Sequence, residues 1–214
     1  MRRVVSWEGG QVSAVVEGSG PTGILVAHGA GTDQHHPMMT SIRSGLAAGG
    51  HTVMTFNYPY TERGSKRPDR QDRLVECHRA AADSLAADVE GLFLAGRSMG
   101  GRMGTYLAAD GYPTLGLILY AYPLHPAGKP EKLRVDQFAD VHVPMLFCQG
   151  TRDALSRMEL FEAHIAPLRR VTVELLEGAG HGSRGGGWTL ETIVERYVTS
   201  TLAWITRLRS GRSS

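Results

Sequence analysis

The segment Gly96-Arg97-Ser98-Met99-Gly100 has the residue types that nucleophilic catalysis by a serine requires. Its GxSxG pattern sets a hydroxyl between two glycines, which tolerate a crowded and sharply turned backbone. A buried strand should precede such a serine and a helix should follow it at once; the runs Leu92–Ala95 and Met99–Ala109 fit these two roles. The start of that helix would also favour negative charge developing beside Ser98. The alternative is a glycine-rich turn that only packs a helix on a strand or cradles a phosphate.

Serine is a poor nucleophile at neutral pH, so it needs a base and a group that orients the base. In chains with this motif the acid and then the histidine follow the serine. Asp153 comes just after the predicted strand Pro144–Gln149, where side chains project toward the ligand-binding edge of an α/β sheet, and we predict that it is the acid. Asp136 and Asp140 are rivals, but they precede that strand and should lie at its opposite end. The structural alternative for Asp153 is a helix cap.

A glycine-rich loop after the last predicted strand, Val171–Leu176, contains His181, which we predict to be the catalytic base. Of the nine histidines in the chain, it is the one after Asp153 that we expect at the carboxyl edge of a strand. His125 follows another strand and could contact the substrate or hold the loop of the acid. The alternative for His125 is a histidine fixed in a proline-rich turn.

The same mechanism requires an oxyanion hole made of backbone N–H groups. Met99, directly after the serine, supplies one donor, and the loop after the strand Gly23–Ala27 should supply the other. We predict that this second donor is Ala30, with Gly31 as the fallback. Gly29 and Gly31 let the backbone approach a substrate closely, so we place them with His125 among the substrate-binding residues. The alternative for this loop is a simple strand-to-helix turn without a role in catalysis. No metal and no organic cofactor is expected.

Short apolar runs alternate with helical patterns along the chain, as a parallel sheet built from βαβ units requires. The predicted fold class is therefore α/β, with a three-layer, doubly wound, mostly parallel sheet. The expected strands are Val12–Val16, Gly23–Ala27, His51–Phe56, Gly91–Gly96, Leu115–Tyr122, Pro144–Gln149 and Val171–Leu176. The expected helices are Pro37–Ala48, one that ends near Ala87, Met99–Ala109, Ala154–Leu168 and Leu190–Leu208.

The 214 residues are enough for one globular domain, which we predict to span 1–214 with a disordered tail from about 208. A net charge of +2 gives no field that would favour nucleic acid as a partner. No apolar run approaches the roughly 18 residues of a membrane span, so no membrane partner is expected. Cys77 and Cys148 are far apart and lack metal-ligand spacing, which favours a reduced, cytoplasmic protein. We expect a monomer or a homodimer.

Taken together, these motifs resemble the α/β-hydrolase superfamily over most of the chain, from about Gly23 to Trp204. The segments that carry the resemblance are His28–Gly31, Gly96–Arg102, Tyr122–Pro126, Gly150–Asp153 and Gly180–Gly182. The stretch Tyr122–Arg134 is also similar to the small dienelactone-hydrolase-like branch. The resemblance implies a triad of Ser98, Asp153 and His181 and an esterase-type acyl transfer. True dienelactone hydrolases carry a cysteine where this chain has Ser98, and some relatives in the branch are subunits of larger assemblies. A non-catalytic interaction module is therefore the alternative function.

The interval His125–Val143 bears on the substrate, because many larger hydrolases insert a helical cap at this place. Here the connection is rich in proline and charge and is too short for a lid of several helices. A minimal fold without a cap domain should have an open, shallow pocket. We therefore predict hydrolysis of a short-chain, soluble, small-molecule ester through an acyl-enzyme. A thioesterase or a peptidase with the same triad is the alternative.

Overall fold

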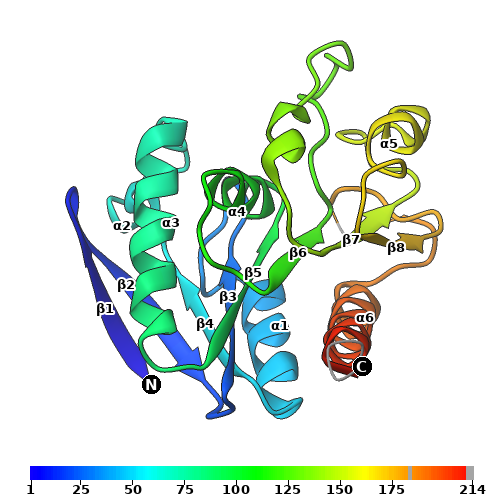
Figure 1. The fold of residues 1–214 in the computed structure, drawn as a ribbon. Coiled ribbons are helices and arrows are strands. Elements are labelled where there is room, and N and C mark those ends of the chain that lie inside the picture. The colour runs from blue at the N-terminus through cyan, green and yellow to red at the C-terminus, as the bar shows by residue number, and fades with distance from the viewer. Residues whose placement is uncertain (183–184, 211–214) are drawn as a thin grey trace.

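The structure, a computed structural model, describes residues 1–182 and 185–210. Its eight strands form one sheet in the order β1-β2-β4-β3-β5-β6-β7-β8 (Figure 1). Strand β2 runs antiparallel to both β1 and β4, and every later neighbouring pair is parallel. The strands are β1 (Arg2–Trp7), β2 (Gly10–Glu17), β3 (Thr22–Ala27), β4 (Thr52–Phe56), β5 (Gly91–Arg97), β6 (Gly116–Tyr120), β7 (Met145–Gly150) and β8 (Val171–Leu176).

Helices cover both faces of the sheet (Figure 1). On one face lie α1 (Pro37–Ala48) and α6 (Leu190–Ser210), and on the other lie α3 (Gln71–Ala86), α4 (Met99–Ala109) and the short α5 (Met158–His164). The helix α2 (Pro59–Glu62) and the 3-10 helix η1 (Asp136–Asp140) belong to connections. Among the described residues no helix is both long and apolar enough to cross a membrane.

Strand β3 shows how the sequence produces the two cores. All six of its residues are buried. Side chains alternate between the faces, so Ile24 and Val26 pack with α1 and α6, whereas Leu25 and Ala27 pack with α3 and α4. Each large apolar side chain buried in this way contributes about 1.5–3 kcal/mol. A strand without a polar face is therefore stable only between two helical layers.

The structure confirms the predicted three-layer, doubly wound, mostly parallel sheet, and it corrects some elements. Strand β1 was not predicted, because Val5 is the only buried residue in it and the six residues show no regular alternation of apolar and polar side chains. The helix expected over Ala154–Leu168 is shorter, since residues up to Arg157 form a turn before α5.

The end of the chain also differs from the expectation. Helix α6 continues to Ser210, so Leu208–Ser210 are helical and not the start of a disordered tail. The rest of the expected tail, 211–214, lies outside the described residues.

Candidate active site

Ser98 occupies the sharp turn between β5 and α4. Its φ of 52° and ψ of −116° lie in a region that residues other than glycine rarely adopt. The Ser98 N–H donates to the carbonyl of Tyr120 at 2.9 Å, and the Ser98 carbonyl accepts from the Arg102 N–H at 3.0 Å. Backbone bonds on both sides therefore hold the strained serine at the carboxyl end of the sheet.

The two glycines of the GxSxG segment are required by close backbone contacts. A Cβ at Gly96 would lie 2.4 Å from the carbonyl carbon of Gly100, and a Cβ at Gly100 would lie 2.3 Å from the carbonyl oxygen of Ala27. Neither contact is possible for a larger residue without moving backbone. Gly96 thus lets α4 start directly on β5, and Gly100 lets it start against the end of β3.

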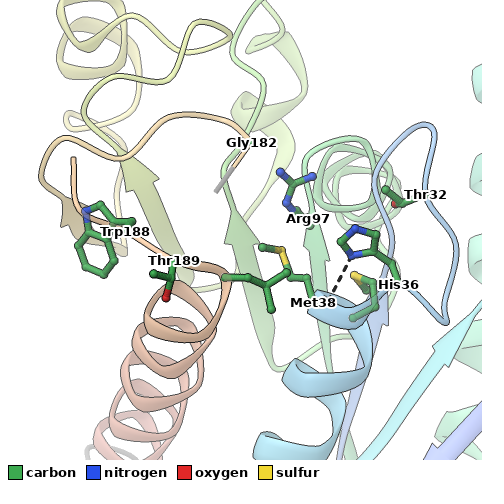
Figure 2. A pocket seen from close by; sticks show the side chains of 9 residues that line it. Thr32, His36, Met38, Arg97, Gly182, Trp188 and Thr189 are labelled. Carbon is green, nitrogen blue, oxygen red and sulfur yellow. Dashed lines mark hydrogen bonds between the residues drawn. The ribbon is translucent and has the colours of Figure 1, made fainter. Parts of the chain in front are cut away.

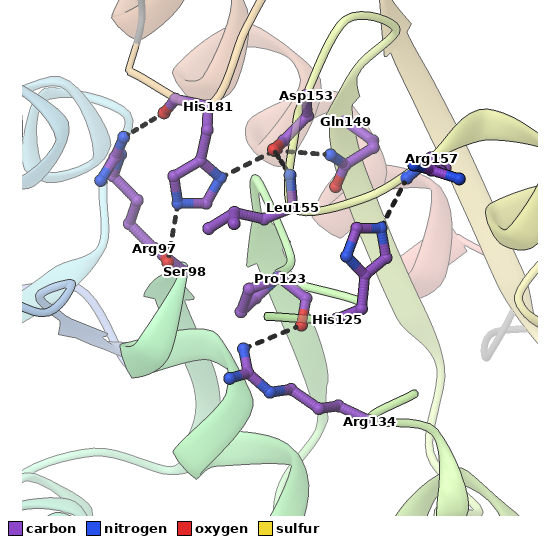
Figure 3. A network of polar contacts seen from close by, with 10 residues as sticks. All are labelled: Arg97, Ser98, Pro123, His125, Arg134, Gln149, Asp153, Leu155, Arg157 and His181. Atoms are coloured by element: carbon purple, nitrogen blue, oxygen red, sulfur yellow. Dashed lines mark hydrogen bonds and ion pairs between the residues drawn. The ribbon is translucent and has the colours of Figure 1, made fainter. Parts of the chain in front are cut away.

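Three side chains from distant parts of the chain meet beyond this turn (Figure 3). The Ser98 Oγ lies 2.9 Å from His181 Nε2, and His181 Nδ1 lies 2.8 Å from Asp153 Oδ2. Ser98 is 8% exposed and Asp153 is 3% exposed, whereas the His181 side chain is 21% exposed. The structure therefore brings together the three residues that the sequence predicts as nucleophile, base and acid.

The carboxylate of Asp153 is fixed by two further donors. Gln149 Nε2 donates to Asp153 Oδ2 at 2.9 Å, and the Leu155 N–H donates to Oδ1 at 2.8 Å (Figure 3). Gln149 is fully buried near the end of β7. Sequence reasoning missed its role, although a polar residue at the end of an otherwise apolar strand is a signal that could have shown it.

His125 does not have the place that we expected for a substrate-binding residue. It is 1% exposed, its Nδ1–H donates to the Pro126 carbonyl at 2.9 Å, and its Nε2 accepts from the Arg157 N–H at 3.2 Å. The His125 N–H also donates to the Leu155 carbonyl at 3.0 Å. Because both ring nitrogens are used by backbone groups, the prediction that His125 contacts substrate is wrong. The side chain holds the loop that carries Asp153 instead.

Arg97 is a second residue whose role the sequence did not indicate, although it lies inside the motif. It is the last residue of β5, and its Nη2 donates to the main-chain carbonyl of His181 (Figure 3). Its Nη1 lies close to the loop after β3, since a Cβ at Gly29 would be 3.3 Å away from it. One guanidinium therefore spans the His181 loop and the loop after β3.

The loop after β3 is shaped by His28, which is buried. Its Nδ1–H donates to the Gly29 carbonyl at 2.8 Å, and its Nε2 accepts from the Tyr58 N–H at 3.1 Å. Burial lowers the pKa of His28 to about 4, so the ring is neutral at physiological pH and can accept from Tyr58. The Thr32 hydroxyl bonds the same Gly29 carbonyl at 3.0 Å.

The oxyanion hole is expected from Met99 and from the loop after β3, and both adjoin Ser98. Met99 is the first residue of α4, so its N–H has no acceptor within the helix. A Cβ at Gly29 would be 3.6 Å from the Ser98 Cβ, which sets the loop against the serine. Ala30 is exposed and Gly31 has a φ of 74°. The roles of Met99, Ala30 and Gly31 toward a substrate stay predictions.

The described part of the chain contains no group of three or more His, Cys, Asp or Glu side chains that could hold a metal ion.

A doubly wound, mostly parallel sheet with a strained serine at a strand-to-helix turn defines the α/β-hydrolase class of fold. A model of the alpha/beta hydrolase domain family matches residues 21–206, so the chain belongs to that family.

Solved structures with the same fold include an alpha-beta serine hydrolase homologue from Coxiella burnetii, with a TM-score of 0.73 and 21% identity over 94% of this chain and 96% of that one. XC6422 from Xanthomonas campestris, a serine hydrolase without a lid, has a TM-score of 0.72 and 22% identity over 97% and 92% of the two chains. Est1E from Butyrivibrio proteoclasticus has a TM-score of 0.77 and 14% identity over 96% and 99%. At these identities the similarity shows the fold alone.

Proposed function

We propose that this protein is a serine-dependent carboxylesterase. The observation that carries the proposal is the unbroken chain of contacts from the Ser98 hydroxyl through His181 to the Asp153 carboxylate, with distances of 2.9 and 2.8 Å. A serine needs such a base in hydrogen-bonding contact, and the base needs an acid that fixes its orientation. The strained backbone of Ser98 supports the same role, because strain of this kind clusters at functional sites.

In the first half of the reaction, Ser98 Oγ attacks the ester carbonyl carbon as its proton moves to His181 Nε2. Asp153 accepts from His181 Nδ1–H and stabilises the imidazolium that forms. The bond from the carbonyl carbon to the alcohol oxygen then breaks, and Nε2 returns its proton to that oxygen. The products of this half are the free alcohol and an acyl group on Ser98.

In the second half, water attacks the acyl carbon while His181 Nε2 takes its proton. The bond to Ser98 Oγ breaks, Nε2 returns the proton to the serine, and the carboxylic acid leaves. Negative charge on the carbonyl oxygen develops in both halves. We propose that the N–H groups of Met99 and Ala30 stabilise it, with Gly31 as the fallback for Ala30 and with Gly29 and Gly31 admitting the substrate.

The proposed substrate is a short-chain, soluble, small-molecule ester. The connection from β6 to β7 supports this choice, since the described residues between these strands form only the short helix η1 and no lid. The stretch Tyr122–Arg134 in this connection also underlies our proposal that the protein is related to the dienelactone-hydrolase-like branch.

The test combines covalent labelling with initial rates. A fluorophosphonate probe should label the wild-type protein, and p-nitrophenyl acetate and butyrate should be hydrolysed faster than long-chain esters. Ser98→Ala should lose the label and lower kcat by several orders of magnitude while the circular dichroism spectrum stays unchanged. Ser65→Ala, in an exposed loop, is the matched control and should keep both.

Two results would contradict the proposal. An unlabelled wild-type protein without esterase activity would favour a non-catalytic interaction module. Preference for thioesters, peptides or long-chain esters in the same assay would keep the triad but overturn the proposed substrate class.

A further inference from the structure

A cavity of about 550 Å³ opens between the starts of α1 and α6 and the residues Arg97 and Gly182 (Figure 2). Arg97 and Gly182, which line it, are the chain neighbours of Ser98 and His181. The opposite walls come from the start of α1, at Met39, and the start of α6, at Leu190. A volume of this size falls in the range of about 300–1,000 Å³ typical of small-molecule sites, so the cavity can hold more of a substrate than an acetyl group.

Among the described residues that line the cavity, Arg97 alone carries a permanent charge. Met39, Trp188 and Leu190 supply apolar walls, and the guanidinium of Arg97 is drawn between Gly182 and Thr32 in Figure 2. Within residues 1–182 and 185–210, no acidic side chain lines this cavity. The cavity is therefore electropositive and partly apolar.

The polar groups around Arg97 are suited to an anion. Thr32 and Thr189 also line the cavity, but the Thr32 hydroxyl donates to the Gly29 carbonyl at 3.0 Å and the Thr189 hydroxyl pairs with the Thr192 hydroxyl at 3.2 Å. His36 Nδ1 accepts from the Met38 N–H at 3.2 Å, so the hydrogen of a neutral His36 ring lies on Nε2, which can donate. An imidazole N–H and a guanidinium can both donate to a carboxylate.

Arg97 itself is half-buried and takes part in no ion pair among the described residues. Its Nη2 donates to the His181 carbonyl, which fixes the plane of the guanidinium. A guanidinium removed from water is stabilised when an anion pairs with it, and its planar fork matches the geometry of a carboxylate.

We infer that this cavity binds a carboxylate carried by the ester substrate, with Arg97 as its counter-ion. The inference rests on the proposed esterase function and narrows its substrate class to esters with an acidic acyl or alcohol part, such as monoesters of dicarboxylic acids. A carboxylate held there would lie close to the scissile bond, because Arg97 adjoins Ser98 in the chain and contacts the His181 loop.

The experiment compares esters that differ only in charge. Monoethyl glutarate is matched with its neutral amide analogue, ethyl 5-amino-5-oxopentanoate, for an acidic acyl part. Acetoxyacetate is matched with 2-acetoxyacetamide for an acidic alcohol part. In a pH-stat assay, the wild-type protein should show a kcat/KM roughly 10- to 100-fold higher for the acidic member of at least one pair.

Arg97→Gln should bring that ratio close to one, and Arg97→Lys should keep part of it, because lysine retains the charge without the fork. Both variants also alter the contact with the His181 carbonyl, which affects both members of a pair, so the ratio is the readout. Arg169→Gln removes an exposed charge outside the cavity and should leave the ratio unchanged.

The outcomes separate this inference from the proposed function. Equal rates on both members of each pair, or a preference that survives Arg97→Gln, would overturn the inference while fluorophosphonate labelling of Ser98 still supported the esterase. If labelling and hydrolysis both fail, calorimetric titration with glutarate decides. Binding that is lost in Arg97→Gln would support the carboxylate site, and no binding to the wild-type protein would overturn it.

Discussion

Asp153 Oδ2 accepts from both His181 Nδ1 and Gln149 Nε2, so one carboxylate oxygen has two partners. The second carboxylate oxygen is held by the Leu155 N–H. Each donor fixes the rotation of the carboxylate, and this rotation sets the direction in which His181 presents Nε2 to Ser98. Gln149 is thus a positioning residue that acts through Asp153.

We predict that Gln149→Met lowers kcat/KM for a simple ester by roughly 10- to 100-fold, because one hydrogen bond to a charged acceptor is lost. Methionine is similar in length and keeps the packing, so KM should change less than kcat. Initial rates with p-nitrophenyl butyrate measure the effect.

Gln137→Met is the matched control. Gln137 is also a buried glutamine, but its amide donates to the Tyr122 hydroxyl at 2.7 Å and to the Thr105 hydroxyl at 3.0 Å. This variant should lower stability and leave kcat nearly unchanged. Equal losses of kcat in both variants would show that Gln149 has only a structural role.

The catalytic roles of single residues were easier to predict from the sequence than the residues that hold them in position. Ser98, Asp153 and His181 could be selected because each follows a predicted strand and their order along the chain fits the motif. The parts played by Arg97 and His125 depend on how two loops approach each other, and this approach has no periodic signal in the sequence. The positions of those side chains therefore required the folded chain.

At the scale of elements, the site depends on how closely α4 approaches β3 and β5. A Cβ at Gly100 would lie 2.3 Å from the Ala27 carbonyl oxygen and 2.7 Å from the His28 carbonyl oxygen. Both contacts are with backbone atoms of β3 and of the loop that follows it. The first turn of α4 and the loop of the proposed oxyanion donor are therefore in direct contact.

We predict that Gly100→Ala lowers the free energy of unfolding by about 3 kcal/mol, because α4 or β3 must move to admit the methyl group. Esterase activity should fall with it, since Met99 and Ser98 move with the helix. Urea unfolding and initial rates measure the two effects.

Gly104→Ala on the same helix is the control. A Cβ there would meet its nearest atoms, in His78 and Leu94, at 3.7 Å, which is an ordinary contact. Alanine favours the helix by about 0.5–1 kcal/mol over glycine, so this variant should be slightly stabilised. A similar loss of stability in both variants would contradict the role of the close contact at Gly100.

The buried strands and helices were predictable from the sequence, because the spacing of apolar residues follows from which side chains face the core. Strand β1 was not, since it lies at the edge of the sheet and buries only Val5. The start of α5 was not predictable either, because a local hydrogen bond from the Leu155 N–H to Asp153 and a tertiary one from the Arg157 N–H to His125 hold the preceding residues in a turn. Helical propensity alone does not predict these hydrogen bonds.

At the scale of the whole molecule, two buried histidines link the folded state to pH. His78 on α3 contacts the Tyr58 hydroxyl at 3.0 Å, and Tyr58 in turn donates its N–H to His28. Burial lowers the pKa of His78 to about 3, with a further contribution from His28, and lowers the pKa of His28 to about 4. Burial raises the pKa of Tyr58, so its hydroxyl stays protonated and can donate to His78.

We predict that stability falls as the pH drops below about 6.5, the ordinary value for histidine. Above that pH both states are neutral at these residues, whereas below it the unfolded chain takes up protons that the folded protein excludes until pH 4 or 3. Each histidine should cost about 1.4 kcal/mol per pH unit across this window. Denaturant unfolding at pH 7, 6 and 5 measures the slope.

His78→Gln removes one titrating group and keeps an acceptor for the Tyr58 hydroxyl, so the slope should fall by about 1.4 kcal/mol per pH unit. His35→Gln, at an exposed histidine, should leave the slope as in the wild-type protein. A flat profile between pH 6.5 and 5 would show that the buried histidines are not linked to folding.

The connection from β6 to β7, which carries only η1, has a consequence for how an esterase of this form would work. Lipases that hide their serine beneath a mobile cover gain activity when they meet an oil droplet that draws the cover aside. This chain has no cover in that connection to draw aside. Its rate would therefore not rise abruptly when the substrate concentration exceeds the solubility limit. Monomeric substrate in solution would reach the serine at every concentration.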